Sequence, residues 1–382
     1  MEGDLAHVSE RVVLHLINTY LFITGSWVYN QLVMMKRYKP VVFSQIVKNL
    51  QVFPFKPVFA MQNAGGLISL SDEILRKLTT QRPWLGQLRR MRGFKPVLLH
   101  AHFGDEAYRN LNLKRRLNIP LVTTFYGYDV SYLVRSAVWR QRYKRLFAEG
   151  DLFFAEGPFL REMLIALGCP PEKVVVHRLG IDIESLPFRE RARPHERPIQ
   201  LMMAASCKEK KGIIYAIKAL ALSQYASHLR LTVIGDGELR RSLEEQARQL
   251  GVADWVTFTG YLAYPDYLKT LVSADIFLSP SVTAIDGDSE GGAPVSLLEA
   301  QALGIPVLAT YHADIPNVVA PNSAFLVPER NPEALAEAID RLAQSPDVCW
   351  KHMSCSGRQF VKDNHNLAIQ IEALQDYYDR LT

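Results

Sequence analysis

The sequence predicts an α/β protein of two doubly wound, Rossmann-like domains that face a cleft. Short apolar segments alternate with helical stretches along all 382 residues, which is the pattern of helices packed on parallel sheets. Residues 187–198 are proline-rich, charged and without periodicity, as expected of a domain linker. We therefore expect an N-terminal domain over 1–186 and a C-terminal domain over 187–362, with ligands at the carboxyl ends of both sheets.

The predicted strands are short apolar runs separated by polar or helical segments. In the first domain they are expected at 11–16, 97–100, 121–124, 152–155 and 174–177. In the second domain they are expected at 201–204, 231–234, 256–258, 276–279 and 307–309.

The composition excludes a disordered protein, because 48% of the residues are hydrophobic and only 22% are charged. The longest apolar candidate, residues 12–35, is interrupted by His15, Asn18 and other polar residues, so we do not expect it to cross a bilayer. We recognise no signal peptide before it. The four cysteines lack metal-binding spacing and are too sparse for a disulfide framework. We therefore expect a cytoplasmic protein.

Positive charge is concentrated in the first half of the chain. Residues 1–186 hold 25 Lys and Arg against 15 Asp and Glu, which leaves 19 against 24 for the rest. Basic clusters at 89–95, 114–116 and 140–145 suit an anionic membrane surface or a phosphate-bearing acceptor. Nucleic acid is not expected as a partner, because no nucleic-acid-binding module accompanies the charge. An ordinary solvated surface is the alternative.

The segment SEGGAPVSLLEAQALGIPVLAT, residues 289–310, predicts a nucleotide-sugar site. Gly291 and Gly292 allow the backbone to approach a ligand closely, and Pro294 suits the first turn of a helix. The free amides at that helix start favour a diphosphate, while Glu299 is placed to accept hydrogen bonds from ribose hydroxyls. The alternative is an ordinary αβ unit with Glu299 on a solvated face.

Two further glycine loops follow predicted strands. IGDGELR at 234–240 has the strand, turn and helix of a dinucleotide fingerprint but lacks its third glycine, so we expect Gly235 to pack beside the nucleotide pocket. ITGSW at 23–27 follows the first strand, and its Gly25 allows close approach to phosphates. A simple βα turn is the alternative for this loop.

HAHFG at 100–104 ends a strand in the basic half. We expect His100 and His102 to point to alternate faces, so that only one of them enters the cleft. His102 is the one expected near the acceptor, and His100 is expected to be satisfied in the core. A metal site formed by these histidines is the weaker alternative.

Seven motifs occur in the order of one enzyme family, and nearly the whole chain resembles the retaining, metal-independent glycosyltransferases of family 4, whose two-Rossmann-domain architecture is called GT-B. They are HAHFG, TTFYGYD at 123–129, HRLGID at 177–182, KEKKG at 208–212, IGDGELR, VTFTGYL at 256–262 and SEGGAPVSLLEA. Members with the EGGAP loop resemble enzymes of bacterial exopolysaccharide and envelope-polysaccharide assembly. The resemblance also implies that an amphipathic helix over about 363–382 packs back on the first domain.

The resemblance assigns roles around the donor. Family members have two glutamates separated by seven residues, whereas eight residues separate Glu290 from Glu299 here, which suggests a one-residue bulge. Glu290 is implied to reach the sugar hydroxyls and Glu299 the ribose. The remaining donor contacts implied are the amides of Gly291, Gly292 and Ala293 to the sugar, Pro294, Val295 and Ser296 at the helix start under the phosphates, and Gly260 and Tyr261 beside the base.

KEKKG resembles the family's basic pair, an arginine and a lysine that neutralise the departing diphosphate. Lys211 takes the lysine position, but Ser206 stands where the arginine is expected. We expect Lys208, Lys210 or a residue elsewhere to supply that charge. Solvent exposure is the alternative for this lysine-rich turn.

Two further positions depart from family patterns. Tyr126 stands where many relatives carry a histidine that contacts the donor sugar, so the contact would pass to a phenol, and Asp129 is expected to brace the same loop. Asp286 and Asp288 form a D-x-D, the metal signature of the other large glycosyltransferase architecture, but we interpret them as a turn. We expect no metal and no cofactor.

The function implied is retaining transfer of a hexose from a nucleotide sugar, UDP-glucose or similar, to a saccharide or lipid-linked saccharide acceptor. Lys211, Glu290 and His102 are the implied catalytic residues. A nucleotide-sugar epimerase of the same architecture is one alternative. A nucleotide-binding subunit that has lost transferase activity is another, because Ser206 and Tyr126 depart from the family pattern.

Overall fold

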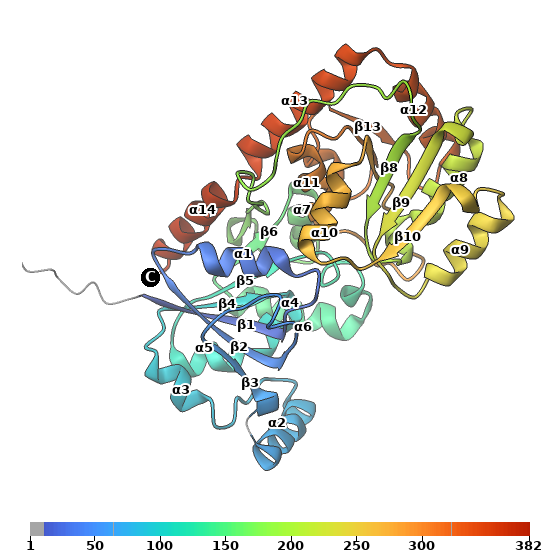
Figure 1. The fold of residues 1–382 in the computed structure, drawn as a ribbon. Coiled ribbons are helices and arrows are strands. Elements are labelled where there is room, and N and C mark those ends of the chain that lie inside the picture. The colour runs from blue at the N-terminus through green and yellow to red at the C-terminus, as the bar shows by residue number, and fades with distance from the viewer. Residues whose placement is uncertain (1–10, 64, 322) are drawn as a thin grey trace, which may run out of the picture. The chain divides into compact units, whose positions relative to one another are not determined.

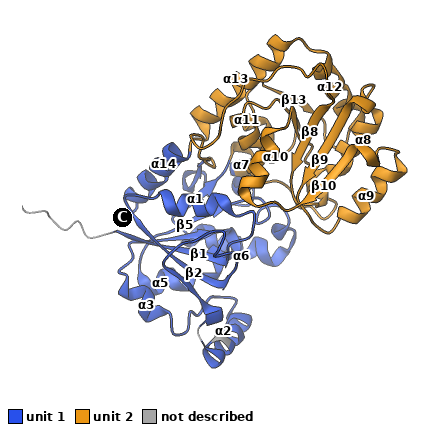
Figure 2. Ribbon diagram, viewed as in Figure 1, with its two compact units in different colours: residues 1–156, 161–177, 367–382 blue, residues 157–160, 178–366 orange. Residues whose placement is uncertain are grey.

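The computed structural model describes residues 11–63, 65–321 and 323–382, and these residues form two compact units (Figure 2). Unit 1 contains the described part of 1–156 together with 161–177 and 367–382. Unit 2 contains 157–160 and the described part of 178–366. Each unit has its own parallel sheet, which confirms the predicted α/β class with two doubly wound units.

Unit 1 is built on a seven-stranded parallel sheet in the order β3-β2-β1-β4-β5-β6-β7 (Figure 1). The strand order reverses between β1 and β4, and ligands of doubly wound folds bind outside the carboxyl ends of strands at such a switch point. The strands are β1 Val12–Tyr20, β2 Lys39–Val47, β3 Val58–Ala60, β4 Leu98–His102, β5 Leu121–Phe125, β6 Leu152–Ala155 and β7 Val174–Val176.

The α-helices of this part of the chain are α1 Ser26–Met34, α2 Gly66–Thr79, α3 Leu88–Gly93, α4 Gly104–Arg109, α5 Leu111–Leu117, α6 Ala137–Glu149, α7 Pro158–Ala166 and α14 Leu367–Asp379. The last of these, α14, returns from the end of the chain to the sheet of unit 1. Its buried residues Leu374 and Tyr378 share a core cluster with Val13 of β1, Leu98 of β4 and Val122 of β5. The carboxyl-terminal helix is therefore an integral part of unit 1.

Unit 2 is built on a six-stranded parallel sheet in the order β10-β9-β8-β11-β12-β13, with its switch point between β8 and β11. The strands are β8 Ile199–Ala204, β9 Leu229–Ile234, β10 Val256–Gly260, β11 Ile276–Ser279, β12 Val307–Thr310 and β13 Ala324–Val327. The α-helices are α8 Ile213–Leu222, α9 Arg240–Gln249, α10 Tyr264–Val272, α11 Val295–Ala302, α12 Pro332–Gln344 and α13 Asp347–Asn364.

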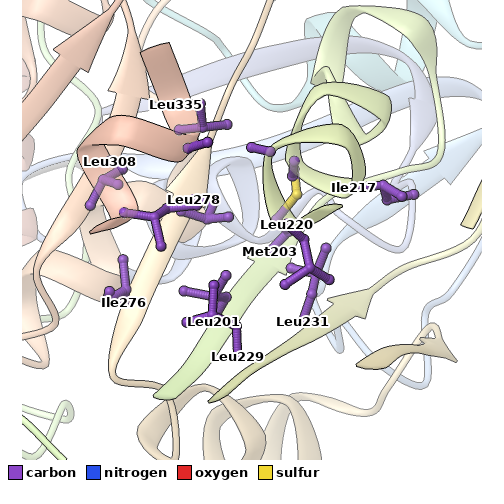
Figure 3. Close-up of a cluster of buried hydrophobic side chains, with 14 of the residues drawn as sticks. Leu201, Met203, Ile217, Leu220, Leu229, Leu231, Ile276, Leu278, Leu308 and Leu335 are labelled. Atoms are coloured by element: carbon purple, nitrogen blue, oxygen red, sulfur yellow. The ribbon is translucent and has the colours of Figure 1, made fainter. Parts of the chain in front are cut away.

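Buried apolar side chains of this sheet pack against α8 and α12 (Figure 3). Leu201 of β8, Leu231 of β9 and Leu278 of β11 are each at most 1% exposed, and Leu220 of α8 and Leu335 of α12 cover them. This apolar layer holds the strands in a rigid sheet, so the loops that leave β8 and β11 start from fixed positions.

Two features differ from the sequence-based expectation. Strands β2, β3 and β13 are absent from it, because β2 mixes Pro, Ser and Gln with its apolar residues and the other two are only three and four residues long. The expected linker, 187–198, instead belongs to unit 2. Arg191 is buried there, its amide donates to Ser354 Oγ at 3.0 Å, and its guanidinium donates to the carbonyls of Val272 and Ala274.

The packing of α14 generates a stability prediction. Leu374→Ala should lower the free energy of unfolding by about 2–5 kcal/mol, because it removes a fully buried side chain and leaves a cavity. Ile369→Ala is the matched control on the same helix, since Ile369 is 55% exposed. Urea unfolding followed by circular dichroism measures both; equal losses for the two variants would show that α14 does not contribute to the core as described.

Candidate functional site

In unit 2, the KEKKG turn and the EGGAP loop leave the two strands at the switch point. KEKKG follows β8, and residues 280–294 connect β11 to α11. The two segments lie against each other at Gly212, which has φ +63°, and a Cβ at this position would stand 1.7 Å from the carbonyl oxygen of Pro280. Only glycine fits this approach. The topology therefore places the lysines of one loop beside the carboxylates of the other.

Lys211 and Glu290 form a partly buried ion pair at this position. Lys211 Nζ lies 2.6 Å from Glu290 Oε1, and Ser281 Oγ donates to the same oxygen at 3.1 Å. Burial alone would raise the pKa of the Glu290 carboxyl, but the charges of Lys211 and Lys210 outweigh it and lower the pKa to about 2. Glu290 is therefore ionised throughout the physiological range.

The other two lysines of the turn differ in their surroundings. Lys210 Nζ lies 3.0 Å from Asp288 Oδ1 and donates to the carbonyl of Ser289 at 3.1 Å. Asp286 Oδ1 accepts the amide of Asp288 at 2.9 Å, so the D-x-D segment has the hydrogen bonding of a turn. Lys208 is exposed. Of the expected substitutes for the family arginine, Lys210 thus holds the loop, and Lys208 is open to a ligand.

The amino end of α11 is fastened to the end of β8. Ser296 Oγ donates to the carbonyl of Ala204 at 2.9 Å, and Pro294 is the N-cap residue before Val295. Gly291, Gly292 and Ala293 are buried in the loop that leads into the helix. The first-turn amides of a helix have no partner within the helix and carry its positive dipole end. This end of α11 therefore has the electrostatic character that favours an anion.

Glu299 lies in the middle of α11, and its carboxylate accepts hydrogen bonds from two tyrosines. Tyr264 Oη donates to Glu299 Oε1 at 3.2 Å, and Tyr267 Oη donates to the other oxygen. Burial raises the pKa of Glu299 to about 7, although both hydrogen bonds oppose that shift. Neither tyrosine was among the predicted site residues; their signal was the i, i+3 spacing that puts both on one face of α10. A ribose hydroxyl that binds Glu299 would replace one of these donors.

The remaining predicted donor residues of unit 2 lie at the carboxyl ends of β9 and β10. Gly235 has φ +138°, and a Cβ there would stand 2.0 Å from the carbonyl oxygen of Ala205, so this turn requires glycine. The Gly235 amide donates to the carbonyl of Gly260 at 2.9 Å. Tyr261 is half exposed, and its hydroxyl donates to the carbonyl of Asp236 at 3.0 Å. These residues form a closed turn beside the loop after β8.

A buried histidine that the sequence analysis missed holds the EGGAP loop. His312 Nε2 accepts the backbone amide of Glu290 at 3.2 Å, and Ser289 Oγ lies 3.1 Å from the same nitrogen. Since an amide can only donate, Nε2 carries no proton, and Nδ1 must donate to Glu329 Oε1 at 2.6 Å. The position of His312 three residues after a predicted strand was an available signal, whereas Glu329 follows the unpredicted β13.

In unit 1, the predicted site residues lie at the carboxyl ends of β1, β4 and β5. Gly25 is the N-cap of α1, and its amide donates to the carbonyl of Phe22 at 2.8 Å. Asp129 is fully buried and accepts the amides of Gly104, Tyr126 and Gly127 at 2.9–3.1 Å. Burial raises its pKa to about 6. Asp129 thus joins the segment after β4 to the segment after β5 and has the contacts of a brace.

The expectation that His100 and His102 point to alternate faces is wrong. Their rings stack at 4.5 Å between centroids with an interplanar angle of 11°, because residues two apart in a strand point to the same face. Both are fully buried. His100 bonds Tyr378 and Thr124, and His102 bonds Tyr126 Oη at 2.6 Å.

His102 also bonds a third histidine, because its Nε2 lies 3.0 Å from Nδ1 of His15 on the neighbouring strand. Burial lowers the pKa of His102 to about 3, so its ring is neutral at physiological pH. His15, His100 and His102 each place one ring nitrogen within 4.8 Å of the others, but hydrogen bonds already involve five of the six ring nitrogens. Tyr126, which is half-buried, ends the row of hydrogen-bonded side chains that begins at His15. Any effect of His102 on a ligand would therefore pass through Tyr126.

Comparison with known proteins finds a glycosyltransferase family match in each half of the chain. Residues 186–356 match the family described as "Glycosyl transferases group 1", and residues 67–185 match "Glycosyltransferase Family 4". The amylovoran biosynthesis glycosyltransferase AmsK of Erwinia amylovora is 34% identical over 287 residues, which are 74% of this chain and 70% of that protein. The putative colanic acid biosynthesis glycosyltransferase WcaL of Salmonella typhimurium is 35% identical over 270 residues, 70% of this chain and 66% of the relative.

Solved structures share the fold at low sequence identity. HepE of Anabaena, in a complex with UDP and glucose, matches with a TM-score of 0.79 and 16% identity over 97% of this chain and all of that chain. Sucrose-phosphate synthase of Thermosynechococcus elongatus matches with a TM-score of 0.77 and 17% identity, over 97% of this chain and 99% of its own. These likenesses show the GT-B fold. Among the described residues, no helix is both long enough and apolar enough to span a bilayer.

The role of His312 can be tested through the amide that it accepts. His312→Ala should leave the buried Glu290 amide without a partner, at a cost of about 1–3 kcal/mol, and should accelerate hydrogen exchange in residues 289–294. His312→Gln should restore slow exchange, because its amide oxygen can accept in place of Nε2. His352→Ala, at an exposed position on α13, is the control. Unchanged exchange in His312→Ala would contradict this role.

Proposed function

This chain belongs to the glycosyltransferases of group 1 and family 4, and we propose that it transfers a hexose from a nucleotide sugar in bacterial polysaccharide biosynthesis. UDP-glucose or a similar sugar is the proposed donor, and a saccharide or lipid-linked saccharide is the proposed acceptor. The names of AmsK and WcaL, with their reference to amylovoran and colanic acid, support the biosynthetic role. The UDP and glucose in the HepE complex support the donor.

The observation that carries this proposal is the pairing of Lys211 with Glu290 beside the amino end of α11, all at the switch point of unit 2. In the proposed donor complex, Lys211 and the helix end stabilise the diphosphate, and Glu299 accepts ribose hydroxyls in place of Tyr264. Glu290 and the amides of 291–293 hold the sugar hydroxyls. Because Glu290 remains ionised, it also stabilises positive charge that develops at the anomeric carbon.

We propose a front-face displacement that retains the anomeric configuration. The bond between the anomeric carbon and the donor's phosphate oxygen breaks, and the acceptor oxygen forms a bond to that carbon on the same face. The acceptor's proton passes to the departing phosphate oxygen. This route requires no covalent enzyme nucleophile and no metal or cofactor, so the protein acts by positioning the reactants and stabilising charge.

Unit 1 is proposed to contact the sugar and the acceptor. The hydroxyl of Tyr126 is held by His102, which His15 holds in turn. Burial raises the pKa of Tyr126 well above its ordinary value, so it acts as a neutral phenol that hydrogen-bonds a sugar hydroxyl. Gly25 and the start of α1 are proposed to approach the donor phosphates. The basic character of this half suits a location at the inner face of the cytoplasmic membrane, where a lipid-linked acceptor would be found.

A panel of nucleotide sugars tests the proposed activity. Incubation with UDP-hexoses and GDP-hexoses, in the presence and absence of EDTA, should release nucleotide from one of them, and proton NMR of the glycoside should show the donor's anomeric configuration. Lys211→Ala should lower the turnover about 10²–10³-fold, whereas the exposed Lys269→Ala should not change it.

The same panel separates the alternatives. A changed sugar that remains attached to its nucleotide would indicate an epimerase instead. Binding without turnover with any acceptor would indicate a subunit without activity, an outcome that Ser206 and Tyr126 keep open. Failure to bind every nucleotide sugar would overturn the proposal.

The pKa of Glu299 predicts a pH dependence of nucleotide binding. Ribose hydroxyls donate to the ionised carboxylate, which predominates above pH 7, so UDP affinity should fall about tenfold between pH 8 and pH 6. Glu299→Gln should bind UDP more weakly and lose this part of the dependence. Calorimetric titrations at each pH measure the UDP affinity of the unaltered chain and of Glu299→Gln. Protonation of UDP itself affects both affinities equally, so it cancels when one affinity is divided by the other. Parallel curves for the two proteins would contradict the ribose assignment.

A further inference from the structure

Helix α2 exposes its apolar side. Leu67 is 83% exposed and Leu78 is 77% exposed, and both lie on one stripe of the helix. The other large apolar residues of this stripe are also exposed, between 38% and 56%, and they are Ile68, Leu70, Ile74 and Leu75. A contiguous apolar face of this kind on a protein surface marks an interaction site.

The opposite side of α2 attaches the helix to unit 1, and it is polar. Asp72 is only 1% exposed, and its carboxylate accepts the backbone amide of Leu85 at 3.1 Å. Of the apolar residues, Ile68 reaches Gly86, where an added Cβ would lie 3.7 Å from its side chain. The helix is therefore amphipathic in the reverse sense to a core-facing helix: among its described residues, the one that it buries is the polar Asp72, whereas its apolar stripe is exposed.

The segment around this apolar face is strongly basic. Residues 66–95 hold seven Lys and Arg against two Asp and Glu, and six of the seven remain when Arg82, which is buried in an ion pair with Glu106, is left out. Arg76 and Lys77 lie in the last turn of α2, and Gly86, which Ile68 contacts, lies two residues before α3. The exposed basic residues that follow are Arg89, Arg90, Arg92 and Lys95.

We propose that α2 inserts its apolar face into an anionic lipid bilayer, with the basic residues of α2 and α3 against the headgroups. An apolar stripe flanked by Lys and Arg is the composition of helices that lie in the membrane interface. A second copy of the chain is a poorer occupant, because it would bring two segments with the same excess of positive charge together. The inference rests on the proposed function, since insertion would bring unit 1 to the surface that holds a lipid-linked acceptor.

Vesicle flotation with phosphatidylcholine alone and with 30% phosphatidylglycerol tests the insertion. The full chain should bind the anionic vesicles at least about tenfold more tightly than the neutral ones. Leu67→Ser combined with Leu78→Ser should reduce that binding about tenfold without any change in charge. Val348→Ser, at a position on α13 that is 68% exposed, is the matched control and should bind as the unaltered chain does.

Three outcomes would overturn the inference: no binding to anionic vesicles, equal binding by the double serine variant, or a dimer that the double variant dissociates. UDP affinity in vesicle-free solution separates this test from the proposed function. Lost vesicle binding with intact UDP binding affects only the membrane inference. Vesicle binding without any nucleotide binding would instead overturn only the proposed function.

Discussion

The ion pair between Lys211 and Glu290 organises the candidate donor site of unit 2. It joins the loops that leave β8 and β11, the two strands at which the order of the sheet reverses. Glu290 is buried and Lys211 is partly buried, so both lose hydration and need close geometry and further hydrogen bonds. Ser281 supplies one such bond, and the neighbouring pair of Lys210 and Asp288 holds the same loop. The site is thus formed before any ligand binds, which is the condition for stabilising charge during a reaction.

Buried imidazoles hold predicted site residues within each unit. In unit 2, Glu329 fixes the tautomer of His312, and His312 then holds the amide of Glu290. In unit 1, His15 and His102 form a chain that ends at the hydroxyl of Tyr126. Burial lowers the pKa of His102 to about 3, so its uncharged ring positions the Tyr126 hydroxyl. The acid–base chemistry of the proposed transfer is correspondingly left to the substrates.

The two amphipathic helices α14 and α2 show how differently one pattern can be used. Leu374 and Tyr378 of α14 are fully buried against the sheet of unit 1, so the apolar stripe of that helix forms part of the core. On α2, the buried contact is made by Asp72, and Leu67 and Leu78 remain exposed. The first arrangement stabilises the fold, whereas the second leaves an apolar surface for a partner outside the chain.

The sequence by itself determined the fold class and which loops meet at the carboxyl ends of the strands of unit 2. These features follow from local patterns: apolar runs form strands, Gly212 and Gly235 permit close turns, and the residues after β8 and β11 must lie at one edge of a parallel sheet. Tertiary structure alone decided the partners of the side chains. These partners include the tyrosines Tyr264 and Tyr267 that bond Glu299 and the His312 ring that accepts the amide of Glu290. They depend on which face of an element packs against a neighbour, as does the exposure of the apolar stripe of α2. Contacts between segments far apart in the chain leave no periodic signal in the sequence.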